Sequence, residues 1–356
     1  MWGKRDDMRV HELEPYNAEP TRAALAVGHL TSTDTFYSRN HGAVPDLDPD
    51  RWRLRVDGLV RGDLDLSLDD LRSGFAHHEL AATMQCAGNR RSELLAVRDI
   101  PGEHPWGPGT TSTATWGGVR LADVLAAAGV DASAEHVAFE APDLAPLASP
   151  PQVYGSSVPL SKATSPEVLL AWQMNGEPLR PVHGAPVRVV VPGYIGARSV
   201  KWVTRVTARA TPSDNYFQET AYRLLPVDGE PAPGAGLSLG PVALNSEILR
   251  PDHGDTVPAG SLRVSGYAYA GDDRSVCRVD VSVDGGTTWR LATLGEASTW
   301  TWQLWHADVD LTAGPAEIVV RAWDSTAATQ PESAAQVWNP KGYVNNSWAR
   351  VSVTVT

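Results

Sequence analysis

A cysteine with two arginines close behind it is the pattern in this chain with the clearest potential for chemistry. Within residues 84–91 (Met-Gln-Cys-Ala-Gly-Asn-Arg-Arg), Cys86 is followed at short range by Arg90 and Arg91. Neighbouring guanidinium groups lower the pKa of a thiol and favour the thiolate, which is the form that binds metals and attacks electrophiles. The small residues directly after the cysteine leave space for a bulky group to approach the sulfur. The segment is therefore a candidate ligating or reactive site.

The chain contains two cysteines, and both could have plain structural roles. An isolated cysteine is often a small buried hydrophobic residue, and residue type alone leaves that role open for Cys86. Cys277 lies in an alternating strand pattern and is expected in a core. Two cysteines cannot supply a disulfide framework, although they could form one bridge.

A second candidate site lies in residues 191–201, where a β-branched run leads into a glycine-bearing loop with Arg198, Ser199 and Lys201. Backbone amides exposed by glycine, together with two cations, make a cradle for an anion. The loop has neither the Gly-Lys-Ser/Thr of a Walker loop nor a Gly-x-Gly-x-x-Gly fingerprint. Residues 183–188 add a histidine and an arginine just upstream. A basic surface turn is the simpler alternative.

Two weaker clusters complete the candidates. Residues 36–41 (Phe-Tyr-Ser-Arg-Asn-His) are densely polar, and Tyr154 ends a proline-rich loop, where a structural tyrosine is the default. The sequence contains no Cys-x-x-Cys zinc pair, His-Glu-x-x-His, haem-attachment motif or Gly-x-Ser-x-Gly elbow. Conventional hydrolase and haem functions are therefore disfavoured.

The elements that would position these residues are of mixed type in the first two thirds of the chain. Ser67 can cap a helix that begins with acidic residues, and residues 121–128 have apolar side chains at helical spacing before a terminating glycine. Residues 187–191 predict a buried strand, and residues 167–172 predict a second strand before an Asn-Gly turn. Helices and strands do not alternate regularly, so we expect an α+β domain.

The last third of the chain has strand patterns throughout. A Pro- and Gly-rich stretch at 226–236 is expected to be a linker or a long surface crossing. Beyond it, apolar and polar residues alternate with Gly-centred turns, which indicates half-buried antiparallel strands. The predicted strands include residues 262–264, 279–283, 318–323 and 351–355, with a turn at 284–286. An all-β, immunoglobulin-like sandwich is expected.

Length and charge narrow the functional classes. A chain of 356 residues is too long for one compact core, and we expect two domains, residues 1–235 and 236–356. The net charge of −12 argues against a general nucleic-acid binder, which needs a basic face. No run of 18 apolar residues is present, so we expect no membrane-spanning helix.

Two features of composition bear on location and sites. The opening residues lack the apolar core of a secretory signal, so the chain as written is expected in the cytoplasm, unless a targeting segment has been removed. Tryptophan is unusually frequent, with 13 residues beside four phenylalanines. Tryptophan often lines sites and interfaces, although filling the core is its simpler role.

Taken together, these segments resemble the sulfite oxidase family of molybdenum-cofactor enzymes. They occur in order from about residue 36 to the C-terminus, and the cysteine block and the Gly-Ala-Arg loop are the most specific. The matching segments are residues 37–41, 85–93, 154–160, 183–193, 196–202, 281–289 and 338–342.

The resemblance implies a molybdopterin-binding catalytic domain followed by an immunoglobulin-like domain that forms a homodimer. It implies that Cys86 gives one thiolate to molybdenum, while the pterin dithiolene gives two more sulfurs; soft thiolates suit such a metal. The implied reaction is oxidation of sulfite to sulfate by oxo transfer. Without a cytochrome domain before Tyr37, no haem is expected, and electrons would pass to oxygen or to a separate redox protein.

The resemblance also implies a set of site residues. The oxyanion pocket would use Arg39, Arg91, Trp106 and Tyr154, because arginine forks match tetrahedral oxyanions. The pterin and its phosphate would be held partly through backbone groups. The residues implied are Tyr37, Asn40, His41, Asp143, His183, Arg188, Arg198, Ser199, Val200 and Lys201.

Two departures from the family pattern concern the substrate. Lys341 stands where sulfite oxidases usually carry a third pocket arginine, and an ammonium group cannot make the planar fork. This predicts weaker sulfite binding or a different natural substrate. Trp106 lies one residue further from Cys86 than the family spacing.

Three alternatives stay open from sequence. Within the family, the chain could reduce nitrate or an S- or N-oxide, which Lys341 would allow. In a different class, Cys86 could be a thiol nucleophile served by His77, His78 or His183. A non-catalytic immunoglobulin-type binding protein would explain the last third but not the segments around Arg39, Cys86 and Lys201.

Overall fold

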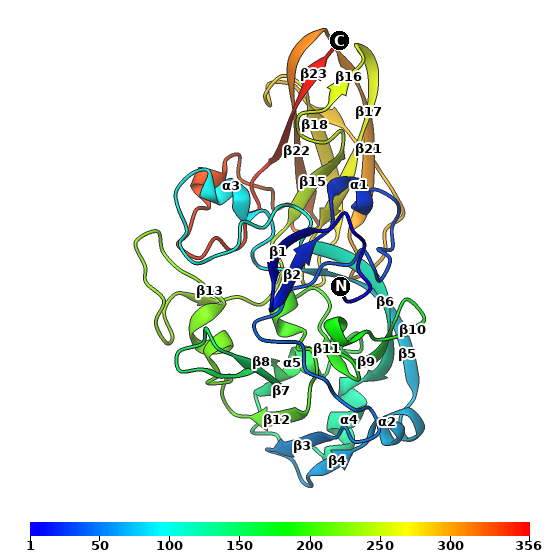
Figure 1. The fold of residues 1–356 in the computed structure, drawn as a ribbon, viewed down its shortest axis with the longest axis vertical. Coiled ribbons are helices and arrows are strands. Elements are labelled where there is room, and N and C mark those ends of the chain that lie inside the picture. Colours follow the sequence, from blue (N-terminus) through cyan, green and yellow to red (C-terminus); the bar gives the residue numbers. More distant parts are fainter.

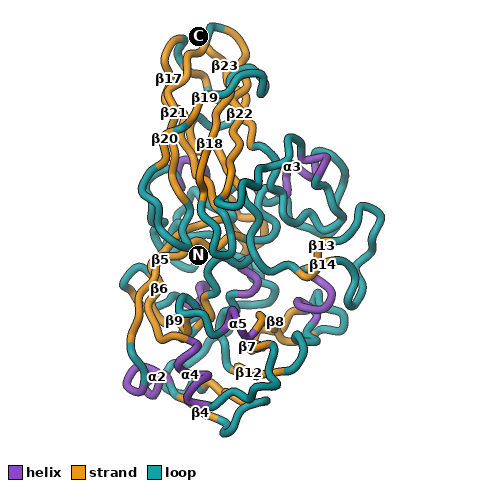
Figure 2. Tube along the Cα trace, turned by 180° about the vertical axis from the view of Figure 1, so that it is seen from behind, coloured by secondary structure: helices purple, strands orange, loops and turns teal.

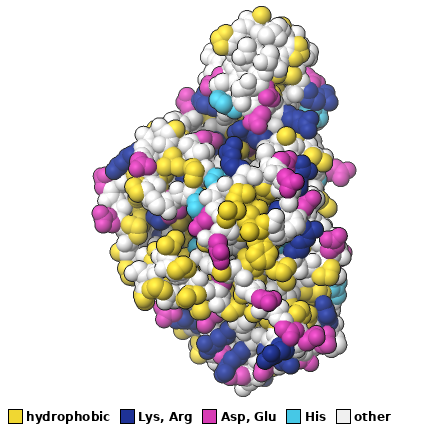
Figure 3. Space-filling view, viewed as in Figure 1, with side chains coloured by type: hydrophobic (Ala, Val, Ile, Leu, Met, Phe, Trp, Pro, Cys, Tyr) yellow, Lys and Arg dark blue, Asp and Glu magenta, His cyan; other side chains and the backbone are white.

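Strands dominate the computed structural model, which describes residues 1–356 and arranges its strands in six sheets. An elongated sandwich that ends at the C-terminus stands on a broader part of mixed structure (Figure 1). Acidic and basic side chains are interspersed where the two parts meet, on the face drawn in Figure 3. None of the helices has the length and apolar character needed to span a membrane.

Two five-stranded sheets form the framework of the mixed part. One has the order β10-β9-β6-β5, with β11 also paired to β9, and the other has the order β4-β3-β12-β7-β8. The strands of the first are β5 (His77–Gln85), β6 (Thr111–Arg120), β9 (Leu169–Met174), β10 (Glu177–Pro178) and β11 (Arg188–Val190). Those of the second are β3 (Leu54–Gly58), β4 (Leu64–Leu66), β7 (His136–Ala145), β8 (Gln152–Pro159) and β12 (Arg205–Arg209).

The helices are short, and the predicted ones are confirmed. Ser67 caps α2 (Leu68–Gly74) through a capping box with Asp70, and α4 (Leu121–Ala128) ends at Gly129, whose φ of 70° suits glycine. Both lie at the end furthest from the sandwich (Figures 1 and 2). The remaining short elements are α1 (Arg22–Leu25), α3 (Arg91–Leu95), α5 (Leu160–Ala163), η1 (Pro181–His183), η2 (Gly196–Arg198), η3 (Phe217–Ala221) and η4 (Ala334–Gln336). An N-terminal hairpin joins β1 (Arg9–Leu13) to β2 (Tyr16–Glu19).

The predicted sandwich is confirmed as two packed antiparallel sheets with one parallel edge pair. Their orders are β15-β17-β21-β20 and β16-β23-β22-β18-β19. The bounds are β15 (Asn245–Arg250), β16 (Thr256–Val257), β17 (Gly260–Tyr269), β18 (Val276–Ser282), β19 (Arg290–Leu291), β20 (Thr293–Leu294), β21 (Gln303–Leu311), β22 (Gly314–Asp324) and β23 (Ala349–Val355). The expectation that Cys277 belongs to this core is wrong, because the residue is exposed. A register shift between Val276 and Arg278 interrupts the alternation at that position.

The two parts are joined by packed residues and not by a flexible linker. Residues 226–236 form the loop of a small hairpin between β13 (Arg223–Leu224) and β14 (Leu237–Ser238). Leu239 and Val242 are then buried in the large core of the mixed part, together with Tyr267 of β17. The chain therefore still packs in the core of the mixed part for a few residues after 235/236, the expected domain boundary. That boundary stays a prediction.

Candidate active site

A cavity lies in the mixed part and collects side chains from segments far apart in the sequence. Residues 36–41, 182–183 and 196–202 supply most of its wall, and Cys86 lies in the wall at the end of β5. Twelve of the residues expected at the site line it: Tyr37, Arg39, Asn40, His41, Cys86, Asp143, Tyr154, His183, Arg188, Ser199, Val200 and Lys201.

Cys86 is presented by a tight turn. Its N–H donates to Thr110 O at 2.9 Å, and the N–H of Gly88 points at its sulfur at 3.4 Å. A Cβ at Gly196 would lie 2.6 Å from the Tyr37 hydroxyl, so glycine lets this loop pack closely against Tyr37. The local chain therefore brings the strand end and the glycine-bearing loop together at the sulfur.

The electrostatics of the thiol differ from the expectation drawn from its two arginines. Burial raises the pKa of Cys86, although Arg91 and Arg39 act in the opposite sense. Neighbouring arginines alone therefore do not produce a free thiolate here. A bound metal ion deprotonates a coordinating thiol outright, so this buried sulfur fits a metal ligand.

A thiol nucleophile would need a base, and the three histidines considered for that role are poorly placed or already engaged. His77 and His78 begin β5 while Cys86 follows its end, a separation of roughly 26–30 Å at 3.3 Å per residue. The Nε2 atom of His183 lies 2.6 Å from the ammonium nitrogen of Lys4. This geometry disfavours cysteine-nucleophile chemistry.

The cavity is built for an anion. Its wall carries Arg39, Arg188 and Lys201 against a single acid, Asp143. Burial lowers the pKa of Arg188 to about 10, and burial followed by the charge of Arg188 lowers the pKa of Lys201. Buried cations without matching acids are costly, so a negatively charged occupant would be strongly stabilised.

Unpartnered polar atoms at the cavity wall give a second indication. Asp143 Oδ1 and Ser38 Oγ are buried and have no hydrogen-bond partner. Burial raises the pKa of Asp143 to about 7. Native proteins rarely leave buried polar atoms without a hydrogen-bond partner, so these two atoms are available to form hydrogen bonds with a polar ligand. These residues fit a bulky cofactor that carries both ring N–H groups and a phosphate.

Lys4 lies outside the cavity wall but contacts the wall residue His183, and sequence patterns did not reveal it. Its ammonium nitrogen lies 2.7 Å from Thr33 O, 2.6 Å from Phe36 O and 2.6 Å from His183 Nε2. It therefore holds the His183 ring against the cavity wall. Nothing in the local sequence marks Lys4, because all its partners are at least 29 residues away.

Lys4 gives a pH prediction with a definite sign. Burial, followed by the charge of Arg180, lowers its pKa from 10.5 to about 7. Between these two values the unfolded chain binds the extra proton, so the free energy of unfolding should rise with pH, by at most about 1.4 kcal/mol per pH unit. Urea unfolding of cofactor-free protein at pH 7 to 10 should show this contribution as a smaller slope in the Lys4→Met variant than in the wild type. Equal slopes in both proteins would contradict the shifted pKa.

Tyr222 is the second residue that sequence reasoning missed. It lines the cavity, and its hydroxyl lies 2.8 Å from His41 Nε2. The Tyr154 hydroxyl instead donates to Ala197 O at 2.8 Å, while its ring stacks on His41 at 4.8 Å. The hydroxyl of Tyr222, and not that of Tyr154, therefore contacts a titratable group. No sequence motif surrounds Tyr222.

Four expected site residues lie outside the cavity wall. Arg198 is buried and donates to Leu239 O and Ser156 Oγ, so it fastens its loop to the junction. Trp106 is fully buried and packs on His11, with ring centroids 4.4 Å apart. Arg91 and Lys341 meet at a third side chain, Glu103.

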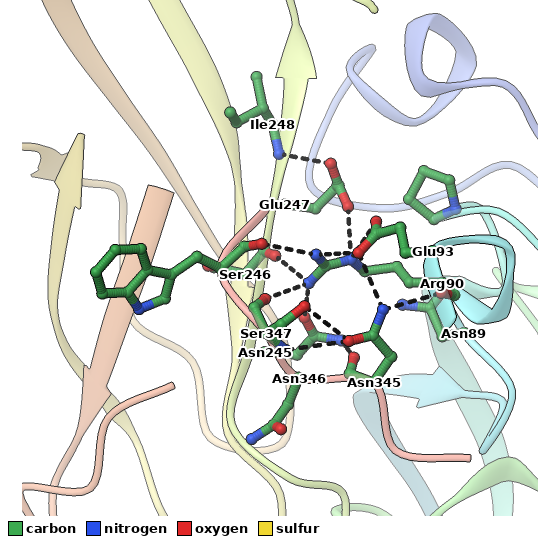
Figure 4. Close-up of polar contacts among 12 residues, drawn as sticks. Asn89, Arg90, Glu93, Asn245, Ser246, Glu247, Ile248, Asn345, Asn346 and Ser347 are labelled. Carbon is green, nitrogen blue, oxygen red and sulfur yellow. Dashed lines mark hydrogen bonds and ion pairs between the residues drawn. The ribbon is translucent and has the colours of Figure 1, made fainter. Parts of the chain in front are cut away.

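Arg90 ties the cysteine segment to the sandwich (Figure 4). It is fully buried, with side-chain nitrogens 2.7 Å from Glu93 and 3.2 Å from Glu247 of β15. It also donates to Asn245 Oδ1 at 3.0 Å and to Ser347 O at 2.8 Å. The sandwich therefore holds the turn that presents Cys86.

Comparison with known families defines the class of the protein. An oxidoreductase molybdopterin-binding domain matches residues 41–217, and a Mo-co oxidoreductase dimerisation domain matches residues 240–356. The cavity lies in the first of these regions, apart from wall residues 36–40 and Tyr222 just outside it. The chain is therefore a molybdopterin-binding oxidoreductase.

Comparison with individual proteins narrows that class. The chain belongs to the sulfite oxidase family of molybdenum-cofactor enzymes. It is 44% identical to chicken sulfite oxidase, over 96% of this chain and 77% of that protein. It is 43% identical to human mitochondrial sulfite oxidase, where 98% of this chain spans 66% of the relative's length.

Two further relatives show the breadth of the fold. A barley nitrate reductase [NAD(P)H] is 39% identical over 99% of this chain and 43% of its own length. The sulfane dehydrogenase SoxCD of Paracoccus pantotrophus superposes with a TM-score of 0.80 at 28% identity, covering 99% of this chain and 90% of that chain. The predicted fold and enzyme class are thus confirmed.

Proposed function

We propose that this enzyme oxidises sulfite to sulfate with a molybdenum cofactor bound in the cavity. The observation that carries the proposal is the buried Cys86 sulfur in a wall that also contains Arg39, Arg188 and Lys201. Curated relatives named sulfite oxidase, at 43–44% identity over nearly the whole chain, support the same substrate.

The residues of the cavity divide into two roles. Cys86 would hold the metal, while the pterin and its phosphate would contact the cations and unpartnered polar atoms, among them Arg188, Lys201 and Asp143. Arg39 and Arg91 would attract the substrate anion. When bound, the cofactor supplies an oxo group and accepts two electrons.

Protons must leave as the reaction proceeds, because sulfite and water become sulfate, two protons and two electrons. Burial, followed by the charge of Arg39, lowers the pKa of His41 well below its ordinary value, so this imidazole is neutral and can accept a proton briefly. The hydrogen bond between Tyr222 and His41 gives such a proton a path along the cavity wall.

The decisive test is metal analysis of the purified protein together with sulfite-dependent ferricyanide reduction by the same sample. About one molybdenum per chain with turnover would support the proposal. Molybdenum without sulfite turnover would point to the reductase alternative. No molybdenum, from a host able to make the cofactor, would contradict the proposal.

Reduction of nitrate is the second candidate, and Lys341 is the observation that favours it. Nitrate reductases are among the relatives, and a lysine replaces the third pocket arginine that sulfite oxidases usually carry. Nitrate-dependent oxidation of reduced methyl viologen by the molybdenum-loaded protein, without sulfite turnover, would support this candidate.

The Lys341→Arg variant tests the position of this residue. An arginine should add one hydrogen bond to a bound oxyanion, worth about 1 kcal/mol, and lower the KM for sulfite about fivefold. Steady-state kinetics with ferricyanide measure this. An unchanged KM would count against Lys341 as part of the oxyanion pocket.

The remaining partners are also proposals. The matching dimerisation domain supports a homodimer through the sandwich, which light scattering after size exclusion can test. We propose a haem-free enzyme that passes electrons to oxygen or to a separate redox protein. Location in the cytoplasm stays a prediction.

A further inference from the structure

Glu103 places its carboxylate between two cations expected to bind the substrate. One oxygen lies 3.2 Å from the Arg91 guanidinium, and the other contacts the Lys341 ammonium group. The Glu103 side chain is only 14% exposed. Burial would raise the pKa of Glu103, but Arg91 and Lys341 outweigh burial and hold it below its ordinary value. The carboxylate is therefore ionised at neutral pH.

Arg91 is fixed independently of Glu103. Its guanidinium donates to backbone oxygens of Lys341, Gly342 and His104 at 3.1–3.2 Å. It also lies over the Tyr343 ring, 5.3 Å from the centroid. Removal of Glu103 would therefore leave this cation in place and without its acidic partner.

Glu103 is held by few contacts beyond its two cations. It follows Gly102, whose φ of 77° lies in the left-handed region and which has nothing within 4 Å of an added Cβ. Glu103 has no side-chain contact with a hydrogen-bond donor other than Arg91 and Lys341. Lys341 has a flexible four-carbon stem and a single charged atom, so its ammonium group can contact either Glu103 or an entering anion.

We propose that Glu103 is a built-in competitor for oxyanions at Arg91 and Lys341, so that its carboxylate weakens the binding of every anion that uses these two cations. An entering anion must replace the carboxylate on Arg91 and Lys341. A dianion brings one more negative charge to the two cations than a monoanion does, so it displaces the carboxylate more readily. The inference rests on the proposed sulfite-oxidising function, because it takes these cations as the substrate pocket.

The test uses sulfate and nitrate as probes that bind without turnover. In the Glu103→Gln variant, the apparent Kd of sulfate, from the rise in Tm with sulfate concentration, should fall about tenfold, which corresponds to one charge-assisted contact of about 1.4 kcal/mol. The Kd of nitrate should fall by a similar factor, because both anions displace the same carboxylate. The KM for sulfite should fall in parallel with the Kd of sulfate.

Asp99→Asn is the matched control, since it removes one exposed acid four residues before Glu103. It should leave both affinities unchanged. Unchanged or weaker sulfate binding in Glu103→Gln, or an equal gain in Asp99→Asn, would overturn the proposal. Glu103→Asp, which keeps the charge on a shorter stem, should give an intermediate affinity and serves if the glutamine variant does not fold.

The binding readout separates this inference from the proposed function. If the wild-type protein contains molybdenum but does not oxidise sulfite, the proposed function fails, while the anion affinities of the variants still test Glu103. If turnover is present and the affinities do not change, only the role of Glu103 fails.

Discussion

Replacement of Cys86 by serine should reduce sulfite-dependent turnover at least about 100-fold, because removal of residues that only support a metal ligand already costs roughly 10- to 100-fold. A serine hydroxyl has nearly the same size but is a harder donor, so it is a poor substitute for a soft thiolate on molybdenum. Ferricyanide kinetics give the loss, and metal analysis shows whether molybdenum is retained.

Cys277→Ser is the control for this variant. Cys277 is exposed and lies at a bulge of β18, so its replacement should change neither turnover nor Tm. The Cys86 variant should also keep its Tm in cofactor-free protein, since the sulfur contacts only the Gly88 N–H within hydrogen-bond distance. Turnover within tenfold of wild type in Cys86→Ser would contradict the assignment of Cys86 as the metal ligand.

Much of the fold was predictable because its signals are local. The capped helix after Ser67, the Asn-Gly turn after β9 and the alternating strands of the sandwich are each specified by residues a few positions apart. Cys277 shows the limit of that reasoning, because the register shift beside it belongs to the pairing of β18 with β22, which the alternation of residues within one strand does not reveal.

The site was predictable where short segments carry several polar residues at once. Residues 36–41 and 196–201 do so, and both line the cavity. Lys4, Glu103 and Tyr222 carry no such pattern, since each has its role through a partner distant in the chain: Lys4 through His183, Glu103 through Lys341 and Tyr222 through His41. Single residues brought together by tertiary structure leave no trace in sequence spacing.

Arg90→Gln should lower the free energy of unfolding by about 3–5 kcal/mol, because it breaks a buried ion pair from one side. Glu247 is fully buried and would keep only Arg22 at 3.2 Å as a cationic partner. Backbone oxygens of Ser246, Ser347 and Trp348 would lose their donor at the same time. Urea unfolding measures the loss.

Arg51→Gln is the control for the lost charge, because Arg51 is exposed and its side chain makes no ion pair or hydrogen bond. Its effect should stay within about 0.5 kcal/mol. If Arg90→Gln cost no more than this control, the buried network would not be what joins the sandwich to the cysteine turn.

The same variant tests whether the sandwich positions the reactive cysteine. Arg90 has a φ of 63° and stands directly before Arg91, so release of its side chain frees the backbone of the turn that presents Cys86. Turnover should therefore fall in Arg90→Gln even at temperatures where the protein remains folded. Glu247→Gln removes the sandwich side of the pair, and the double variant should lose less stability than the sum of the single losses, since each removes the same interaction. Additive losses, with full turnover in the folded Arg90 variant, would show that the sandwich does not support the active site through this contact.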